Sequence, residues 1–196
     1  MNKTQKMKNA LLASCLLCLG VDYTDATQDR TQLQIHVDQQ REYAVINDSQ
    51  DLDTLINESR DSVYIPNGLY HFWVYGGNVS NIRFIKVEDG TKGIDCFYHW
   101  FKNLVGIVLP DSVTSIDKDA FSGCSYLNIR TLPKKLASIG SLAFFGCESL
   151  AIEELPGTLL SIGEAAFYKC KNLKKLTVKN DIGSIGTAAF CETGLT

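Results

Sequence analysis

The sequence lacks the features that mark several large classes of protein. Its formal net charge is only −3 and its pI is about 5.6, so no strong basic field is available to attract nucleic acid. Hydrophobic residues make up 45% and charged residues 21% of the 196 residues, a balance that argues against a disordered or collagen-like chain. This length is typical of one domain, or of one domain with a small appendage.

Motifs of catalysis and cofactor binding are also missing. The chain contains no GxSxG, HExxH, Walker or GxGxxG sequence. It has three histidines, His36, His71 and His99, and Cys96 with His99 forms a CxxH pair that has no second pair to complete a four-ligand zinc site. We therefore expect no enzymatic activity, no metal and no cofactor. The alternative is an enzyme whose site lies in residues 22–93 and uses His36 or His71.

No apolar run reaches the roughly 20 residues that a membrane-spanning helix needs. The 12-residue run Ala10–Val21 follows Lys3, Lys6 and Lys8, a pattern that predicts a secretory signal peptide at residues 1–21 and a secreted or cell-surface protein. Cys15 ends a short sequence similar to a bacterial lipoprotein box, so lipid anchoring through Cys15 is one alternative. An uncleaved N-terminal helix in an intracellular protein is another.

Charge divides the remaining chain near residue 60. Residues 22–59 carry nine acidic and two basic side chains, whereas residues 60–196 carry 13 acidic and 14 basic ones. We expect residues 22–59 to form an acidic N-terminal capping region and residues 60–196 to form a separate, nearly neutral unit.

An internal repeat dominates that unit. IDKDAFSGCSYL begins at Ile116, and similar sequences begin 23, 46 and 69 residues later, at Ile139, Ile162 and Ile185. Aligned columns hold phenylalanine at Phe121, Phe144, Phe167 and Phe190, cysteine at Cys124, Cys147 and Cys170, and leucine at Leu127, Leu150 and Leu173. A repeat this short cannot bury its own apolar side, so it predicts a solenoid in which each coil stacks on its neighbours.

The pattern continues upstream with a period of 22 residues. Six strand segments are predicted, at residues 60–65, 82–87, 104–109, 127–132, 150–155 and 173–178. Prolines follow three of them, where a missing N–H group costs no hydrogen bond between strands: Pro110, Pro133 and Pro156. We expect short parallel strands on the concave face, with the IGxxAFxxC stretch crossing the convex face as a short helical turn.

These repeats resemble the BspA-type (Treponema-type) leucine-rich repeat family, whose units read much like IGxxAFxxCxxLxxLxLPxSLxS. The resemblance covers residues 94–196 well and residues 60–93 weakly. It implies a right-handed α/β repeat solenoid and, in many relatives, an exported surface protein engaged in adhesion or host contact. The motif is specific for the fold and weak for function.

Two coils depart from the expected pattern. Arg130 and Glu153 occupy positions where an apolar residue is expected, and Ile129 and Ile152 stand one position earlier. Strict register would bury the two charges, which is costly, and would expose Ile129, Ile152 and Phe84 as an apolar stripe. We favour a local bulge that buries both isoleucines and exposes both charges.

The seven cysteines do not indicate a disulfide framework or a metal site. Two belong to the predicted signal, and the three in the repeat column suit a small apolar core position. Disulfides between adjacent coils would rarely meet the required geometry, which leaves Cys191, off the column, as the expected free thiol. The disulfide state of Cys96 stays open. Five lysines gather in the last complete repeat, where we expect a solvated face rather than an anion-binding one: Lys169, Lys171, Lys174, Lys175 and Lys179.

The function expected from this sequence is non-enzymatic protein binding or adhesion across the strand face. The partner would be a protein, such as a host surface or matrix protein, and no oligomeric state is indicated. The residues expected to point outward at strand centres, and so to contact the partner, are Lys86, Val108, Thr131, Glu154 and Thr177. The repeat pattern stops within a seventh coil, so residues 185–196 serve as an improvised cap or the chain is a truncated or partial array without independent activity. An intracellular effector or scaffold is the remaining alternative.

Overall fold

The computed structural model describes residues 44–45, 61–65, 79–94 and 101–196. All of them belong to one compact unit, Gln39–Thr196. The predicted signal peptide, nearly all of the acidic capping region, the three histidines and Cys96 lie outside the described residues.

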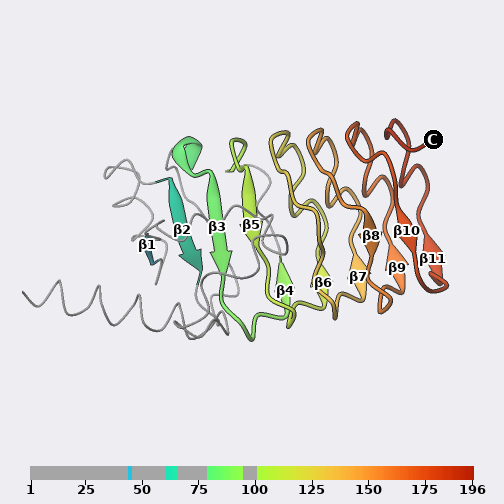
Figure 1. The fold of residues 1–196 in the computed structure, drawn as a ribbon, viewed down its shortest axis with the longest axis horizontal. Coiled ribbons are helices and arrows are strands. Elements are labelled where there is room, and N and C mark those ends of the chain that lie inside the picture. The colour runs from blue at the N-terminus through green and yellow to red at the C-terminus, as the bar shows by residue number, and fades with distance from the viewer. Residues whose placement is uncertain (1–43, 46–60, 66–78, 95–100) are drawn as a thin grey trace, which may run out of the picture. The chain divides into compact units, whose positions relative to one another are not determined.

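The chain winds as a parallel-strand β-solenoid of about five turns. Its strands fall into two columns, and four of the described turns carry one strand in each column (Figure 1). The first column holds a four-stranded parallel sheet, β1 (Ala44–Val45), β2 (Ser62–Ile65), β3 (Phe84–Val87) and β5 (Gly106–Val108), followed by a two-stranded sheet, β8 (Glu154–Leu155) and β10 (Thr177–Val178). The second column is one five-stranded parallel sheet, β4 (Gly93–Ile94), β6 (Ser115–Ile116), β7 (Ser138–Ile139), β9 (Ser161–Ile162) and β11 (Ser184–Ile185).

The second column follows directly from a recurring Ser-Ile dipeptide. Ser115 pairs in register with Ser138, and Ile116 with Ile139, and the same register continues through the following coils. Side chains on a strand alternate between its two faces, so the isoleucines of β4, β6, β7 and β9 are buried while the serines lie on the outer side. A register slip would expose every isoleucine at once, which fixes this pairing.

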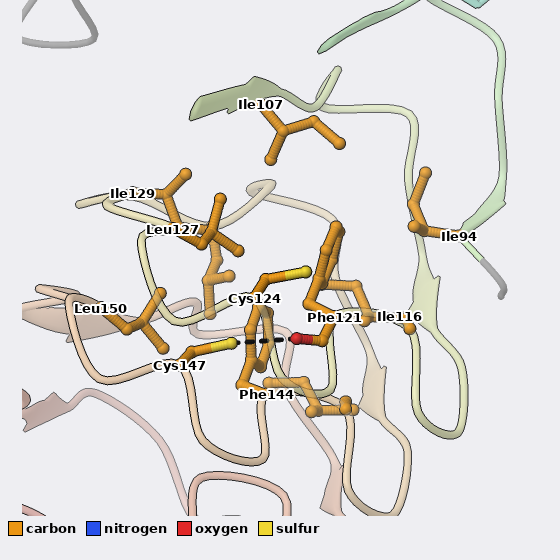
Figure 2. Close-up of a cluster of buried hydrophobic side chains, with 14 of the residues drawn as sticks. Ile94, Ile107, Ile116, Phe121, Cys124, Leu127, Ile129, Phe144, Cys147 and Leu150 are labelled. Atoms are coloured by element: carbon orange, nitrogen blue, oxygen red, sulfur yellow. Dashed lines mark hydrogen bonds between the residues drawn. The ribbon is translucent and has the colours of Figure 1, made fainter. Parts of the chain in front are cut away.

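The core consists of side-chain ladders that run from coil to coil. Phe121 stacks on Phe144 with ring centroids 5.2 Å apart, and the stack continues through Phe167 to Phe190. Leu127 and Leu150 are fully buried beside it, and Figure 2 shows the phenylalanine, cysteine and leucine side chains of adjacent coils in contact. The three predicted columns therefore all lie in the shared core.

The structure does not support the predicted helical turns on the far side of each coil. Residues 117–126 and their counterparts in later coils are hydrogen-bonded turns, and the described chain has one helical element, the three-residue 3-10 helix η1 (Val79–Asn81). Alternate N–H groups bond the next coil instead of their own segment, as when Phe144 donates to the Ala166 carbonyl at 2.8 Å. Leu142 (φ 60°) and Ala165 (φ 50°) are left-handed, which also interrupts a helix.

The predicted strand at residues 127–132 does not form. Strands do form within the other predicted first-column segments, although β8 and β10 are only two residues long. In this coil the Asn128 N–H still bonds the Val105 carbonyl at 2.9 Å and the Ile129 carbonyl accepts from the Ala151 N–H at 3.3 Å, but these isolated bonds do not make a strand. Ile129 and Leu132 are both buried, and two exposed residues separate them, so the strand cannot keep a strict alternation.

Candidate protein-binding surface

We call one surface the strand face. It comprises the outward side of the first-column strands and residues 127–132 between them. The register pairs four of the five predicted contact residues along it, and Thr131 belongs to no strand. Lys86 pairs with Val108 across β3 and β5, and Glu154 pairs with Thr177 across β8 and β10. The repeat thus brings four residues that are distant in sequence into two adjacent pairs.

Exposure varies among these five residues. Thr131, Glu154 and Thr177 are exposed, and Val108 is half-buried. Lys86 is buried, with only 8% of its surface exposed, so its predicted position as an exposed contact residue is wrong. Its ammonium Nζ lies 5.9 Å from the centroid of the Tyr64 ring on the adjacent coil, which holds the charge over an aromatic face instead of in solvent.

The side-chain positions predicted for two coils, which are called the bulged coils below, are confirmed by burial. Ile129 and Ile152 are 2% and 1% exposed, whereas Arg130 and Glu153 are both exposed. The alternative, an outward stripe containing both isoleucines, is therefore wrong, and Phe84 is half-buried.

The bulge changes what the strand face presents. Each bulged coil projects two consecutive side chains outward instead of one: Arg130 with Thr131, and Glu153 with Glu154. The strand face therefore carries one positive charge in the first of these coils and two negative charges in the next.

Ion pairs between coils cross the lysine-rich end of the solenoid. Lys179 lies 2.5 Å from Glu154, and Lys171 lies 2.8 Å from Glu148, a hydrogen bond that raises the pKa of Lys171. Lys174 and Lys175 are exposed. Because carboxylates of the preceding coil neutralise part of the lysine charge, this region is a mixed surface and not a uniformly basic one.

The buried cysteines form a hydrogen-bonded ladder. Cys147 Sγ donates to the Phe121 carbonyl oxygen at 3.1 Å, as the dashed line in Figure 2 shows, and Cys170 Sγ donates in the same way to Phe144. Burial raises the pKa of both Cys124 and Cys170 to about 12, and that of Cys147 well above its usual value. These thiols stay protonated at neutral pH and act as core side chains.

Cys191 differs from the other described cysteines in its surroundings. It is exposed, and all four described cysteines are free thiols, so the prediction for Cys191 is confirmed. The cysteine column passes through Thr193 in this coil, whose Oγ1 donates to the Phe190 carbonyl at 2.9 Å. This bond stays within one coil, whereas the thiols of Cys147 and Cys170 bond the preceding coil, so Thr193 does not extend the ladder.

Sequence reasoning missed a shallow open depression at the edge of the strand face. It lies just before the first-column strands and is lined by Asp61, Ser80, Asn81, Arg83, Asn103, Val105 and Tyr126. Tyr126 is 59% exposed. Its position immediately before the ladder residue Leu127 could have located it, because Asn81 and Asn103 hold the same place before Ile82 and Leu104.

Neither metal ligation nor membrane insertion finds support in the part of the chain that the structure describes. No group of three or more histidine, cysteine, aspartate or glutamate side chains is arranged to hold a metal ion there. In the same residues no helix has the length and apolar character needed to cross a membrane.

Comparison with known proteins identifies the repeat. The family model described as the BspA type leucine rich repeat region matches residues 91–196 in six copies. A crystal structure of a leucine rich repeat protein from T. pallidum is similar, with a TM-score of 0.51, 25% identity and coverage of 79% of this chain and 66% of that chain. A leucine rich cell surface protein from Faecalibacterium prausnitzii matches with a TM-score of 0.38 and 22% identity, over 59% of this chain and 36% of that one. No curated protein matches the chain.

Proposed function

The chain belongs to the BspA-type leucine-rich repeat family, and from this premise we propose that it is a non-enzymatic module that binds a protein partner through the strand face. The observation that carries this proposal is the pair of bulged coils. Arg130, Thr131, Glu153 and Glu154 project from adjacent coils whose spacing is fixed at about 4.8 Å by the fold.

The chemistry of this surface favours a partner with charges of both signs. Arg130 stands beside the acidic pair of the next coil, and Lys179 pairs with Glu154. Alternating charges contribute more to orientation and to the choice of partner than to affinity. The exposed threonines supply neutral hydrogen-bonding groups between these charges.

A charge exchange on the strand face tests the proposal. The full chain is passed over a panel of immobilised extracellular-matrix and plasma proteins, and binding is measured by surface plasmon resonance. The double variant Arg130→Glu, Glu153→Lys keeps the net charge and is expected to weaken any specific binding at least tenfold. The control is Lys118→Glu, Glu164→Lys, which exchanges two exposed charges of the outer turns and should change the affinity less than twofold. Absence of reproducible binding, or equal effects of the two variants, would contradict the proposal.

We propose an extracellular or cell-surface location for this module. The supporting observation is the positively charged start and short apolar run of residues 1–21. Mass spectrometry of the protein isolated from its own host is expected to show the loss of residues 1–21 or a lipid on Cys15. An intact N-terminus in the isolated protein would place it inside the cell.

A further inference from the structure

We propose that the depression beside the strand face is a binding site for an oligosaccharide. It draws on four successive coils, with Asp61 in the first and Tyr126 in the last. With about 4.8 Å between coils, these two residues lie about 14 Å apart along the solenoid, which suits a ligand of two or three sugar rings.

Two columns of the repeat build the floor and rim of this site. Asp61, Arg83 and Val105 occupy one column, two residues before the buried strand side chains Val63, Ile85 and Ile107. Asn81, Asn103 and Tyr126 occupy the other column, and all three are exposed. Because both columns are tied to core ladders, the site is fixed by the same packing that holds the coils together.

The side chains of the site suit hydroxyl groups. Asn103 Nδ2 donates to the Ser80 carbonyl at 2.8 Å, which holds the carboxamide across two coils. The carboxamides offer donors and acceptors together, as sugar hydroxyls do. Tyr126 adds a largely exposed ring, on which the apolar face of a sugar can lie while its hydroxyls reach the polar groups.

The charge of the site argues against other ligand classes. One guanidinium and one carboxylate leave it with no net charge, which disfavours phosphate groups and nucleic acid. No carboxylate among the described residues forms an ion pair with Arg83, so the guanidinium can also pair with the carboxylate of an acidic sugar. The polar, open surface lacks the apolar anchor pocket of a typical protein-binding hot spot.

A glycan array tests this inference with the labelled full chain as the probe. Wild type is expected to bind a defined subset of the immobilised glycans, and Tyr126→Ala should reduce that binding at least tenfold. Tyr126→Phe keeps the ring and should retain at least half of the signal. Tyr168→Ala, which removes a tyrosine from the outer turns, is the matched control and should bind as wild type does.

Two results would overturn the inference: a wild-type protein that binds no glycan on the array, or a Tyr126→Ala variant that is folded by circular dichroism and binds unchanged. The strand-face variant Arg130→Glu, Glu153→Lys should leave glycan binding unaltered. The protein-binding proposal and the oligosaccharide proposal therefore fail independently.

Discussion

Single glycines decide how closely the coils can approach one another. A Cβ atom built on Gly140, Gly163 or Gly186 would lie 2.3–2.5 Å from backbone atoms of the preceding coil. Each of these three positions directly follows the isoleucine of a second-column strand, in β7, β9 and β11. Backbone cannot move aside as a flexible side chain can, so none of these three glycine positions accepts a Cβ atom without a shift of the backbone.

We expect Gly163→Ala to lower the free energy of unfolding by about 3 kcal/mol, because its methyl group would overlap the backbone nitrogen of Ser141. Urea denaturation followed by circular dichroism measures this change. The control is Gly157→Ala, whose new methyl would meet only the side chain of Asn180 at 3.2 Å. Its stability should stay within about 0.5 kcal/mol of wild type, and an equal loss in both variants would contradict the argument.

The buried thiols make stability depend on pH in the alkaline range. In the unfolded chain a cysteine ionises near its ordinary pKa of 9.0, whereas in the fold the pKa of Cys170 is about 12. A raised folded pKa contributes stability that is fully present below pH 9 and is lost as the pH rises toward 12. For each such thiol, the free energy of unfolding should therefore fall by about 1.4 kcal/mol per pH unit above pH 9.

Comparison of wild type with Cys170→Ser isolates this contribution. We expect the difference in unfolding free energy between the two proteins to shrink between pH 9 and pH 10.5, because serine does not ionise there. Urea titrations at a series of pH values provide the measurement. A difference that stays constant with pH would show that the thiol of Cys170 is not shielded from solvent.

At the scale of an element, the bulged coils show how a strand loses the strict alternation of inward and outward side chains. Moving the inward isoleucine one position earlier keeps Ile152 in the core and leaves Glu153 and Glu154 together on the surface. The coil length stays at 23 residues, so the neighbouring turns remain in place. The cost is the loss of strand pairing at residues 127–132, which separates the two sheets of the first column.

Alanine at two adjacent positions tests the bulge. Ile152→Ala should destabilise the protein by about 2–4 kcal/mol, because it leaves a cavity beside fully buried neighbours. Glu153→Ala should change stability by less than about 0.5 kcal/mol, because its side chain is exposed. Thermal denaturation distinguishes the two, and a larger effect at Glu153 would indicate the opposite register.

The sequence predicts the core columns well, but it does not predict the second strand column or the conformation of the turns. Columns of Phe121, Cys124 and Leu127 locate the core because apolar periodicity reports burial directly. The second strand column was not predicted, although Ser-Ile recurs in β6, β7, β9 and β11, because a two-residue strand is too short to show an alternating pattern. Helical turns were expected in IGxxAFxxC, but hydrogen bonds to residues 22 positions away outweigh local propensity there.

The candidate surface was also only partly predictable. Thr131, Glu154 and Thr177 are exposed as predicted, but Lys86 is buried, with its ammonium over the ring of Tyr64, a neighbour 22 residues away in sequence. Asp61 and Tyr126 come to line one depression only when four coils are stacked. Such contacts depend on register between coils, which a motif alone does not specify.

For the whole molecule, every described coil contacts its neighbours, and no described coil has a hydrophobic core of its own. Each of the ladders of phenylalanine, cysteine and leucine passes from one coil to the next. Stability is then close to a sum of coil and interface contributions. A substitution such as Gly163→Ala should therefore destabilise chiefly its own coil and the adjoining ones.

The hydrogen bonds between coils also decide how the protein responds to mechanical load. Because they run from one coil to the next, a force along the solenoid loads the interfaces in series, and the weakest opens first. Tethers attached at Asn103→Cys and the exposed Cys191 would apply such a force. Optical tweezers should record successive small steps of about 80 Å, the extended length of one 23-residue coil, whereas a single rupture of the whole array would contradict this expectation. A solenoid built this way would lengthen under load one coil at a time and keep the remaining coils intact.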